Sequence, residues 1–103
     1  MKVTNLGVIV ATRALSLAGK PRVTVVLGKP EPFPDHTGFY RPFRITGLGS
    51  DSIRYAGGED AVQALTLTLR MIGSLLYTSS EAKTGLLTWD AAPTPGDLGF
   101  PRP

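Results

Sequence analysis

One long amphipathic segment, residues 60–79, constrains the fold of this chain more than any other feature. No proline interrupts it. Its large apolar residues recur at spacings of three and four, which places them on one face of a helix: Val62, Leu65, Leu69, Ile72 and Leu76. Because ordering the backbone costs roughly 1–2 kcal/mol per residue, the segment predicts a long helix that lies against an apolar surface.

Two positions refine this helix. Asp60 precedes Gln63 by three residues, a capping-box spacing in which the carboxylate accepts a hydrogen bond from a free amide of the first turn. Gly73 weakens the helix by roughly 1 kcal/mol relative to alanine. We therefore expect a close backbone contact at Gly73.

Short segments rich in apolar and β-branched residues surround the helix and predict strands: residues 6–17, 22–27, 39–48, 53–56 and 86–89. The turn at residues 18–21 joins the first two as an antiparallel hairpin. Pro42 cannot donate to a sheet ladder, so the third strand lies at an edge or carries a bulge. The prediction is an α+β fold: an antiparallel sheet of four to five strands with one long α-helix packed on one face.

The chain of 103 residues predicts a single domain, 1–103, with a loop at residues 80–85 and an irregular proline-rich tail from about residue 91. Leu98 and Phe100 are expected to pin the tail to the body. With zero cysteines and no apolar run long enough for a bilayer, we expect a soluble cytoplasmic protein without a membrane partner.

No residue pattern indicates catalysis. The only histidine, His36, lies in the proline-rich stretch 29–38, and no G-x-S-x-G elbow is present. The glycines of residues 47–51 fit neither a P-loop nor a GxGxxG pattern and indicate a turn. The sequence therefore predicts no catalytic residue, no metal site and no cofactor, and an enzyme is the less favoured interpretation.

Arginines on the predicted strands are the candidates for binding. An arginine on a sheet surface can hold a carboxylate or phosphate through a bidentate fork. The speculative ligand-binding set is Arg13, Tyr40, Arg44 and Asp60. The alternative, and the favoured one, is structural pairing of the arginines with nearby acids: Glu59, Asp60 or Asp90.

Charge bears on nucleic-acid binding. The net charge is +3 and the pI about 9.6, but the eleven Lys and Arg are scattered, with no two adjacent. A dedicated nucleic-acid binder usually shows a clustered basic stripe. Nucleic acid is therefore an unfavoured partner, kept as an alternative through an arginine-bearing sheet.

The segments FYRPFRITGLG, GGEDAVQALTLTLRMIGSLL, LLTWD and DLGFP together resemble a small uncharacterised bacterial domain family of unknown function. In it a glycine-turn strand precedes a G-x-D-x-x-Q-A-L helix, and a Trp strand and an L-G-F-P tail follow. The resemblance covers roughly residues 6–101. It implies a stand-alone bacterial protein and brings no activity, substrate or site residue.

The functional hypothesis is a non-enzymatic protein-interaction or accessory module of the immunity type. A single helix covers one side of a sheet, so Val8, Val10 and Val26 are expected on the opposite face. The tail or a second copy of the chain would cover them, and we hypothesise a homodimer. The other hypotheses are nucleic-acid binding and a small-molecule binder or enzyme that uses Arg13 and Arg44.

Overall fold

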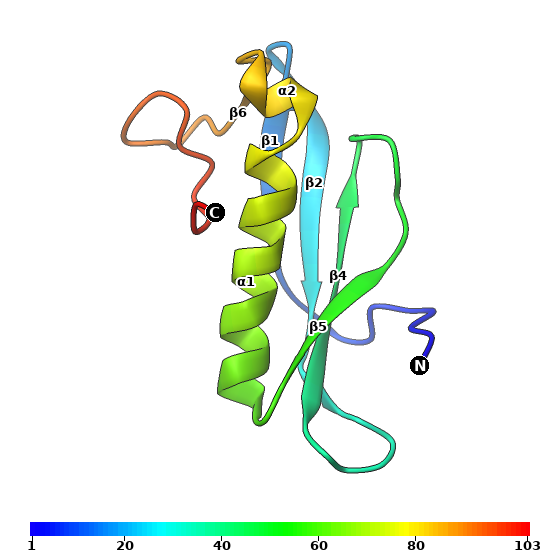
Figure 1. The fold of residues 1–103 in the computed structure, drawn as a ribbon. Coiled ribbons are helices and arrows are strands. Elements are labelled where there is room, and N and C mark those ends of the chain that lie inside the picture. The colour runs from blue at the N-terminus through cyan, green and yellow to red at the C-terminus, as the bar shows by residue number, and fades with distance from the viewer.

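The computed structural model describes residues 1–103 and contains one antiparallel sheet and two helices (Figure 1). In chain order the elements are β1 (Ile9–Leu17), β2 (Lys20–Gly28), β3 (Glu31–Pro32), β4 (Phe39–Thr46), β5 (Arg54–Gly58), α1 (Ala61–Tyr77), α2 (Ser80–Lys83) and β6 (Leu87–Thr88). The α+β class is as predicted. The strand count of four to five was too low, and residues 80–83 form a short helix where a loop was expected.

Four strands of the sheet form an antiparallel meander, and the last strand is added beside the first. β1, β2, β4 and β5 pair in sequence, and β6 comes back after the helices to pair with β1. The sixth strand is β3, which adds two residues beside the start of β4. It was missed because its sequence, a Glu and a Pro within a proline-rich loop, has no strand pattern.

Pro42 interrupts the ladder of an interior strand. β4 pairs with β5 along one side, while its other side pairs with β2 up to Phe43 and with β3 from Tyr40. Pro42 lies in the gap between these two ladders, where no backbone N–H is needed. The segment that joins β2 to β3 has one residue more across this gap than β4 has. β4 is therefore irregular at Pro42, although it is not an edge strand.

The helix α1 begins as its sequence predicts. Asp60 is the N-cap, and its Oδ1 accepts a hydrogen bond from the Gln63 backbone N at 2.8 Å. The Gln63 side chain in turn accepts from the backbone N of Glu59 at 2.7 Å. The expected capping box is therefore present, except that the Gln63 side chain bonds to the amide of Glu59 and not to that of the N-cap residue.

The buried face of α1 differs from the predicted stripe. Its buried residues are Ala64, Thr68, Ile72, Gly73 and Leu76, whereas Val62 is 71 % exposed and Leu65 36 % exposed. Small residues line the buried face in the first half of the helix. The prediction counted only large apolar side chains. In the first half of the helix it therefore assigned the buried face to a side that is exposed to solvent.

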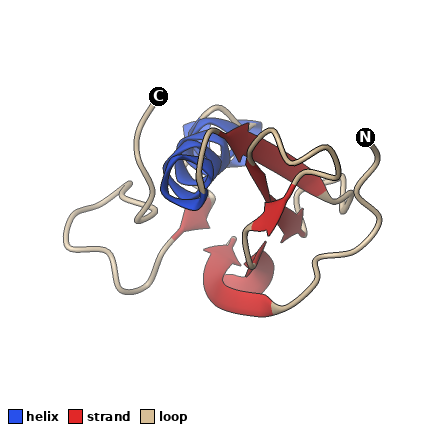
Figure 2. Cartoon of the chain, turned by 90° about the horizontal axis from the view of Figure 1, so that it is seen from below, coloured by secondary structure: helices blue, strands red, loops and turns tan.

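The core joins the helix to the strands. α1 runs alongside the strands and contacts β4 and β5 (Figures 1 and 2). Ile72 and Leu76 from α1 share one buried cluster with residues from β1, β2, β4, β6 and the tail: Leu15, Val23, Val25, Leu27, Phe43, Leu87 and Leu98. None of the helices combines the length and apolar composition that crossing a bilayer requires.

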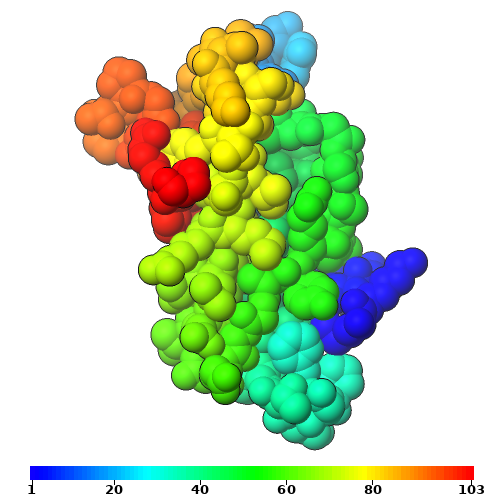
Figure 3. Space-filling model, in the orientation of Figure 1, coloured from blue at the N-terminus to red at the C-terminus, as the bar shows by residue number.

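The C-terminal tail folds back along α1 and forms a lobe beside its second half (Figure 3). Leu98 is fully buried in the core cluster, and Phe100 packs against that cluster. A Cβ at position 73 would collide with the carbonyl oxygen of Pro101. Gly73 therefore marks the close backbone contact that its place in the helix indicated.

Candidate functional site

Arg13, the first predicted ligand residue, holds the tail. Its Nη1 donates to the carbonyl oxygen of Gly99 at 2.9 Å. Its guanidinium carbon lies 4.0 Å from the ring centroid of Trp89 and 5.1 Å from that of Phe100. Such cation–π contacts are worth about 0.5–1 kcal/mol at exposed sites and about 2 or more when desolvated. We call Arg13, Trp89 and Phe100 the arginine cluster.

Gly99 is required at the centre of this arrangement. Its φ is +78°, a left-handed conformation that L side chains rarely adopt, and an added Cβ would strike both Arg13 and Trp89. Each residue of the L-G-F-P motif therefore has a packing role: Leu98 fills the core, Gly99 accepts from Arg13, Phe100 joins the arginine cluster and Pro101 meets Gly73.

Tyr40 and Arg44 lie on one face of β4 but have different neighbours. Tyr40 contacts Phe33 and Tyr55, with ring centroids 5.4 and 5.7 Å away, and Phe33 lies 6.2 Å from Tyr55. We call these three residues the aromatic cluster. Arg44 pairs with Val26 across the ladder, and its Nε is buried without a hydrogen-bond partner.

Asp60, the last predicted ligand residue, uses its carboxylate to cap α1. None of the predicted ligand residues lines the largest pocket of the chain. Arg13 stacks under the tail, Tyr40 belongs to the aromatic cluster and Asp60 caps the helix, so each of these side chains already has a structural partner. A ligand held jointly by the set stays a prediction.

The arginines bond to backbone carbonyls. Arg13 donates to Gly99, Arg41 to Gly28 at 3.0 Å and Arg102 to Gly96 at 3.2 Å. Sequence reasoning favoured carboxylate partners instead. It had no means of finding these acceptors, since every residue carries a carbonyl and only the fold determines which one lies within reach.

Arg41 is the one buried arginine, 6 % exposed. Burial lowers the pKa of its guanidinium, because taking the cation out of water disfavours the charged form. Its Nε bonds to the carbonyl oxygen of Gly28, the last residue of β2 and the one that follows the final Leu27–Phe43 pair of the β2 to β4 ladder. Arg41 thus supplies a donor next to Pro42, which has none.

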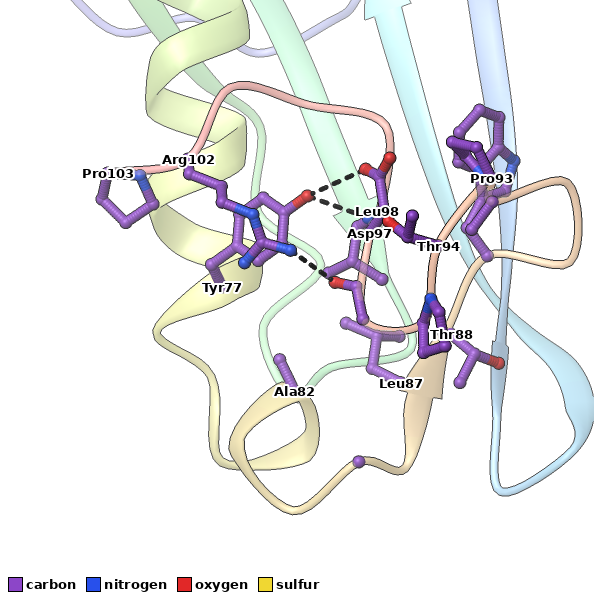
Figure 4. Close-up of a pocket in the computed structure, with 15 residues that line it drawn as sticks. Tyr77, Ala82, Leu87, Thr88, Pro93, Thr94, Asp97, Leu98, Arg102 and Pro103 are labelled. Atoms are coloured by element: carbon purple, nitrogen blue, oxygen red, sulfur yellow. Dashed lines mark hydrogen bonds between the residues drawn. The ribbon is translucent and has the colours of Figure 1, made fainter.

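The largest pocket, 810 Å³, lies between the tail, β6 and the end of α1 (Figure 4). Its polar groups are bonded to one another. The Tyr77 hydroxyl accepts from the Leu98 backbone N at 2.8 Å and lies 3.4 Å from the Asp97 carboxylate. Arg102 stacks on the Tyr77 ring at 4.5 Å and donates to Gly96. These contacts close the tail onto the body.

A different surface is left open along β1. Only Ser16 and Leu17 of this strand pair with β6, so the outer edge from Ile9 to Leu15 has no strand beside it. The apolar residues there are exposed: Val8 by 63 %, Ile9 by 46 % and Val10 by 49 %. The tail, one of the two covers expected for Val8 and Val10, packs instead with the core cluster. We take this edge as the candidate functional site.

The sequence marks this site with a continuous apolar run at residues 8–11. Such a run is typical of a strand that is covered on both faces, as in a buried sheet. In the structure the same run lies at an unpaired edge, with Val10 and Ala11 exposed. The order of the strands in the sheet decides whether such a run is a buried strand or an edge strand. The composition of a single strand does not reveal that order.

The chain belongs to the family described as Domain of unknown function (DUF6968), whose family model matches residues 11–102. The expected resemblance to a family of unknown function is thereby confirmed. No curated protein and no solved structure matches the chain.

Proposed function

We propose that this DUF6968 domain is a non-enzymatic protein-interaction module that binds its partner by strand addition at the outer edge of β1. The observation that carries the proposal is the unpaired edge from Ile9 to Leu15 with exposed Val8, Ile9 and Val10 beside it. An accessory role of the immunity type is one use of such a module.

Natural sheets usually protect a long edge with lysine, proline, a bulge or a covering loop. β1 contains no lysine and no proline, and its only charge is Arg13. The register of β1 with β2 shifts between Ile9 and Ala11 and again between Leu15 and Leu17, so the pairing is regular from Ala11 to Leu15. An added strand gains main-chain hydrogen bonds along such an edge, and alternate side chains set its specificity.

The remaining polar features support the proposal by being occupied. Arg13, Arg41 and Arg102 are bonded to backbone carbonyls, and Tyr77 and Asp97 hold the tail. Their chemistry serves the fold. At the β1 edge an unpaired strand and exposed apolar side chains occur together, so both are free for another molecule.

The test is site-specific photo-cross-linking in the native host. A benzophenone amino acid replaces Ala14 at the β1 edge, and in a matched control it replaces Thr24, which lies beside Ala14 on β2. We expect a discrete adduct from position 14 that is at least about fivefold weaker from position 24. No adduct from position 14, or equal adducts from both, would refute the module.

A second candidate function, nucleic-acid binding, is favoured by Arg44. Its Nε is buried without a partner, and alternation places it on the same sheet face as Arg22 and the threonines at 12, 24 and 46. Guanidinium and hydroxyl groups are common phosphate ligands. This candidate makes the open sheet face, and not the edge, the binding surface.

Salt dependence separates the two candidates. If the sheet face binds nucleic acid, affinity for a single-stranded oligonucleotide falls steeply with salt, and Arg44→Ala reduces the slope by about 1. Arg70→Ala, on the exposed side of α1, is the matched control with the same charge change. A flat salt response eliminates this candidate.

A further inference from the structure

The C-terminal tail is joined to the body through side chains. No backbone–backbone hydrogen bond connects residues 91–103 with a helix or a strand. The bonds that cross from the body to the tail come from two body side chains. Arg13 donates to the Gly99 carbonyl, and the Tyr77 hydroxyl contacts Leu98 and Asp97. A segment held in this way can detach while every backbone ladder of the body stays intact.

The end of the tail, from Thr94 onward, has hydrogen bonds of its own. The backbone N of Asp97 donates to the Thr94 carbonyl at 3.2 Å. The backbone N of Gly99 donates to the Asp97 carboxylate at 2.7 Å, and Arg102 donates to a carbonyl inside the same segment at 3.2 Å. Three prolines restrict its backbone further. Because these bonds are internal, residues 94–103 can keep their shape when they move, and we call them the strap.

The connection before the strap is suited to act as a hinge. Asp90 is fixed to β1, since its carboxylate accepts a hydrogen bond from the Ser16 hydroxyl at 3.2 Å. In residues 91–93 the only backbone hydrogen bond runs from the Ala92 N to the Trp89 carbonyl, at 3.0 Å. Few bonds therefore resist a rotation of the chain between Asp90 and the strap.

The strap spans unfilled space. The 810 Å³ pocket lies between it and the body (Figure 4). On the strap the pocket is lined by residues 94–98, Arg102 and Pro103, and on the body by Tyr77 and Leu87 among others. Packed protein interiors leave few voids larger than a water molecule. The strap is thus held by a few anchors and not by packing along its whole length.

We propose that the strap swings away from the body as a unit about residues 91–93 and is the movable wall of this pocket. Its main anchors in the closed state are Leu98, which is fully buried in the core cluster, and Phe100, which packs against that cluster. Release leaves the sheet and α1 folded, opens the pocket to solvent and frees Arg13 from the Gly99 carbonyl. This device goes beyond the proposed function and does not depend on the β1 edge.

Thiol labelling of the full chain tests the release, because the chain has no native cysteine. Leu98→Cys places a buried thiol on the strap. Leu76→Cys is the matched control, since it makes the same substitution at an equally buried position of the same cluster, on α1. Under conditions where reclosing outpaces labelling, we expect Leu98→Cys to react at least about a hundredfold faster than Leu76→Cys. Equal rates would overturn the inference.

Second substitutions separate release of the strap from global unfolding. Tyr77→Phe removes the hydroxyl that binds the Leu98 amide, so it should accelerate labelling of Leu98→Cys about two- to tenfold. Phe33→Leu loosens the aromatic cluster of the meander. It should accelerate labelling of Leu76→Cys and leave that of Leu98→Cys unchanged. Acceleration of both cysteine variants by Phe33→Leu would contradict an independent strap.

The unmodified chain supplies an independent readout through its single tryptophan. Trp89 lies against the strap, since a Cβ at Gly99 would be 2.7 Å from its ring. Its fluorescence therefore reports release, whereas far-UV circular dichroism reports α1. During urea unfolding we expect the Trp89 transition at lower urea concentration and with a smaller slope, because release of the strap exposes less surface. Coincident transitions with equal slopes would show that strap and body unfold together and would refute the proposal.

Discussion

The aromatic cluster and the arginine cluster are both built from stacked side chains, but they join different parts of the chain. Phe33, Tyr40 and Tyr55 come from neighbouring segments of the meander. The arginine cluster connects Arg13 on β1 to Trp89 and Phe100 near the C-terminus. The first reinforces strands that already pair, whereas the second attaches a tail with no strand or helix of its own.

This difference shows where cations are needed. Within the sheet, backbone hydrogen bonds fix the strands, and the aromatic rings add about 0.5–1.5 kcal/mol per pair. The tail has few backbone bonds to the body, so Arg13 bonds to the tail at Gly99, and Arg102 of the tail stacks on the Tyr77 ring of α1. Removing an arginine should therefore destabilise the attachment of the tail, and removing an aromatic ring should destabilise the meander.

The largest effect is expected from Arg13→Ala. It removes two cation–π contacts and a hydrogen bond to Gly99, a loss of about 2–3 kcal/mol. Hydrogen exchange of the Leu98 and Gly99 amides should accelerate strongly, while β5 amides keep their protection. Arg13→Lys, which keeps the charge but loses the planar ring contact, should fall between. Equal acceleration in β5 would show that the tail and sheet unfold together.

Gly73→Ala should come next, with an effect whose sign depends on Arg13. In the intact chain the new Cβ collides with the Pro101 carbonyl oxygen and costs about 1–2 kcal/mol. In an Arg13→Ala background the tail is already loosened, so alanine should stabilise the helix by up to about 1 kcal/mol. Denaturant unfolding of the unmodified chain, the two single variants and the double variant measures this coupling as a double-mutant cycle. Additive effects would mean that Pro101 stays in place without Arg13.

Local patterns in the sequence were sufficient for the longer elements and for the cap of α1. Asp60 and Gln63 identified the start of α1, because a helix cap depends on residues a few positions away. Gly73 indicated a close contact through its low helix propensity, although the residue that it meets, Pro101, is distant in the sequence. The hairpin between β1 and β2 followed in the same way.

Features that depend on distant segments were beyond sequence reasoning. The acceptors of Arg13 and Arg41 are backbone carbonyls, which carry no residue-type signal. The open edge of β1 depends on where β6 returns and how soon it ends. The rotated helix stripe has a similar cause: Ala64 and Thr68 are buried by their position over the sheet, although neither residue is strongly hydrophobic.

In the aromatic cluster, Phe33→Leu should give a smaller and local loss. Leucine keeps most of the apolar area but loses the contacts with both tyrosine rings, about 1 kcal/mol. Thermal unfolding should shift downward by a few degrees, and exchange of the Leu98 and Gly99 amides should be unchanged. Faster exchange in the tail would contradict the independence of the two clusters.

The smallest expected effect lies at Asp35, in the loop that carries Phe33 toward Tyr40. Hydrogen bonds from the Thr37 hydroxyl at 2.7 Å and from its backbone N at 3.1 Å hold the pKa of this exposed carboxyl below its ordinary value. A lowered folded-state pKa stabilises the protein above the unfolded pKa, and that contribution is lost as pH falls through the folded-state pKa.

Asp35→Asn should therefore lower the unfolding temperature slightly at pH 7 and have almost no effect near pH 2.5. Thr37→Ala removes the donor hydroxyl, so Asp35→Asn in that background should show a weaker pH dependence. A difference that grows toward acid pH would mean that the Asp35 carboxylate strains the loop beside the aromatic cluster.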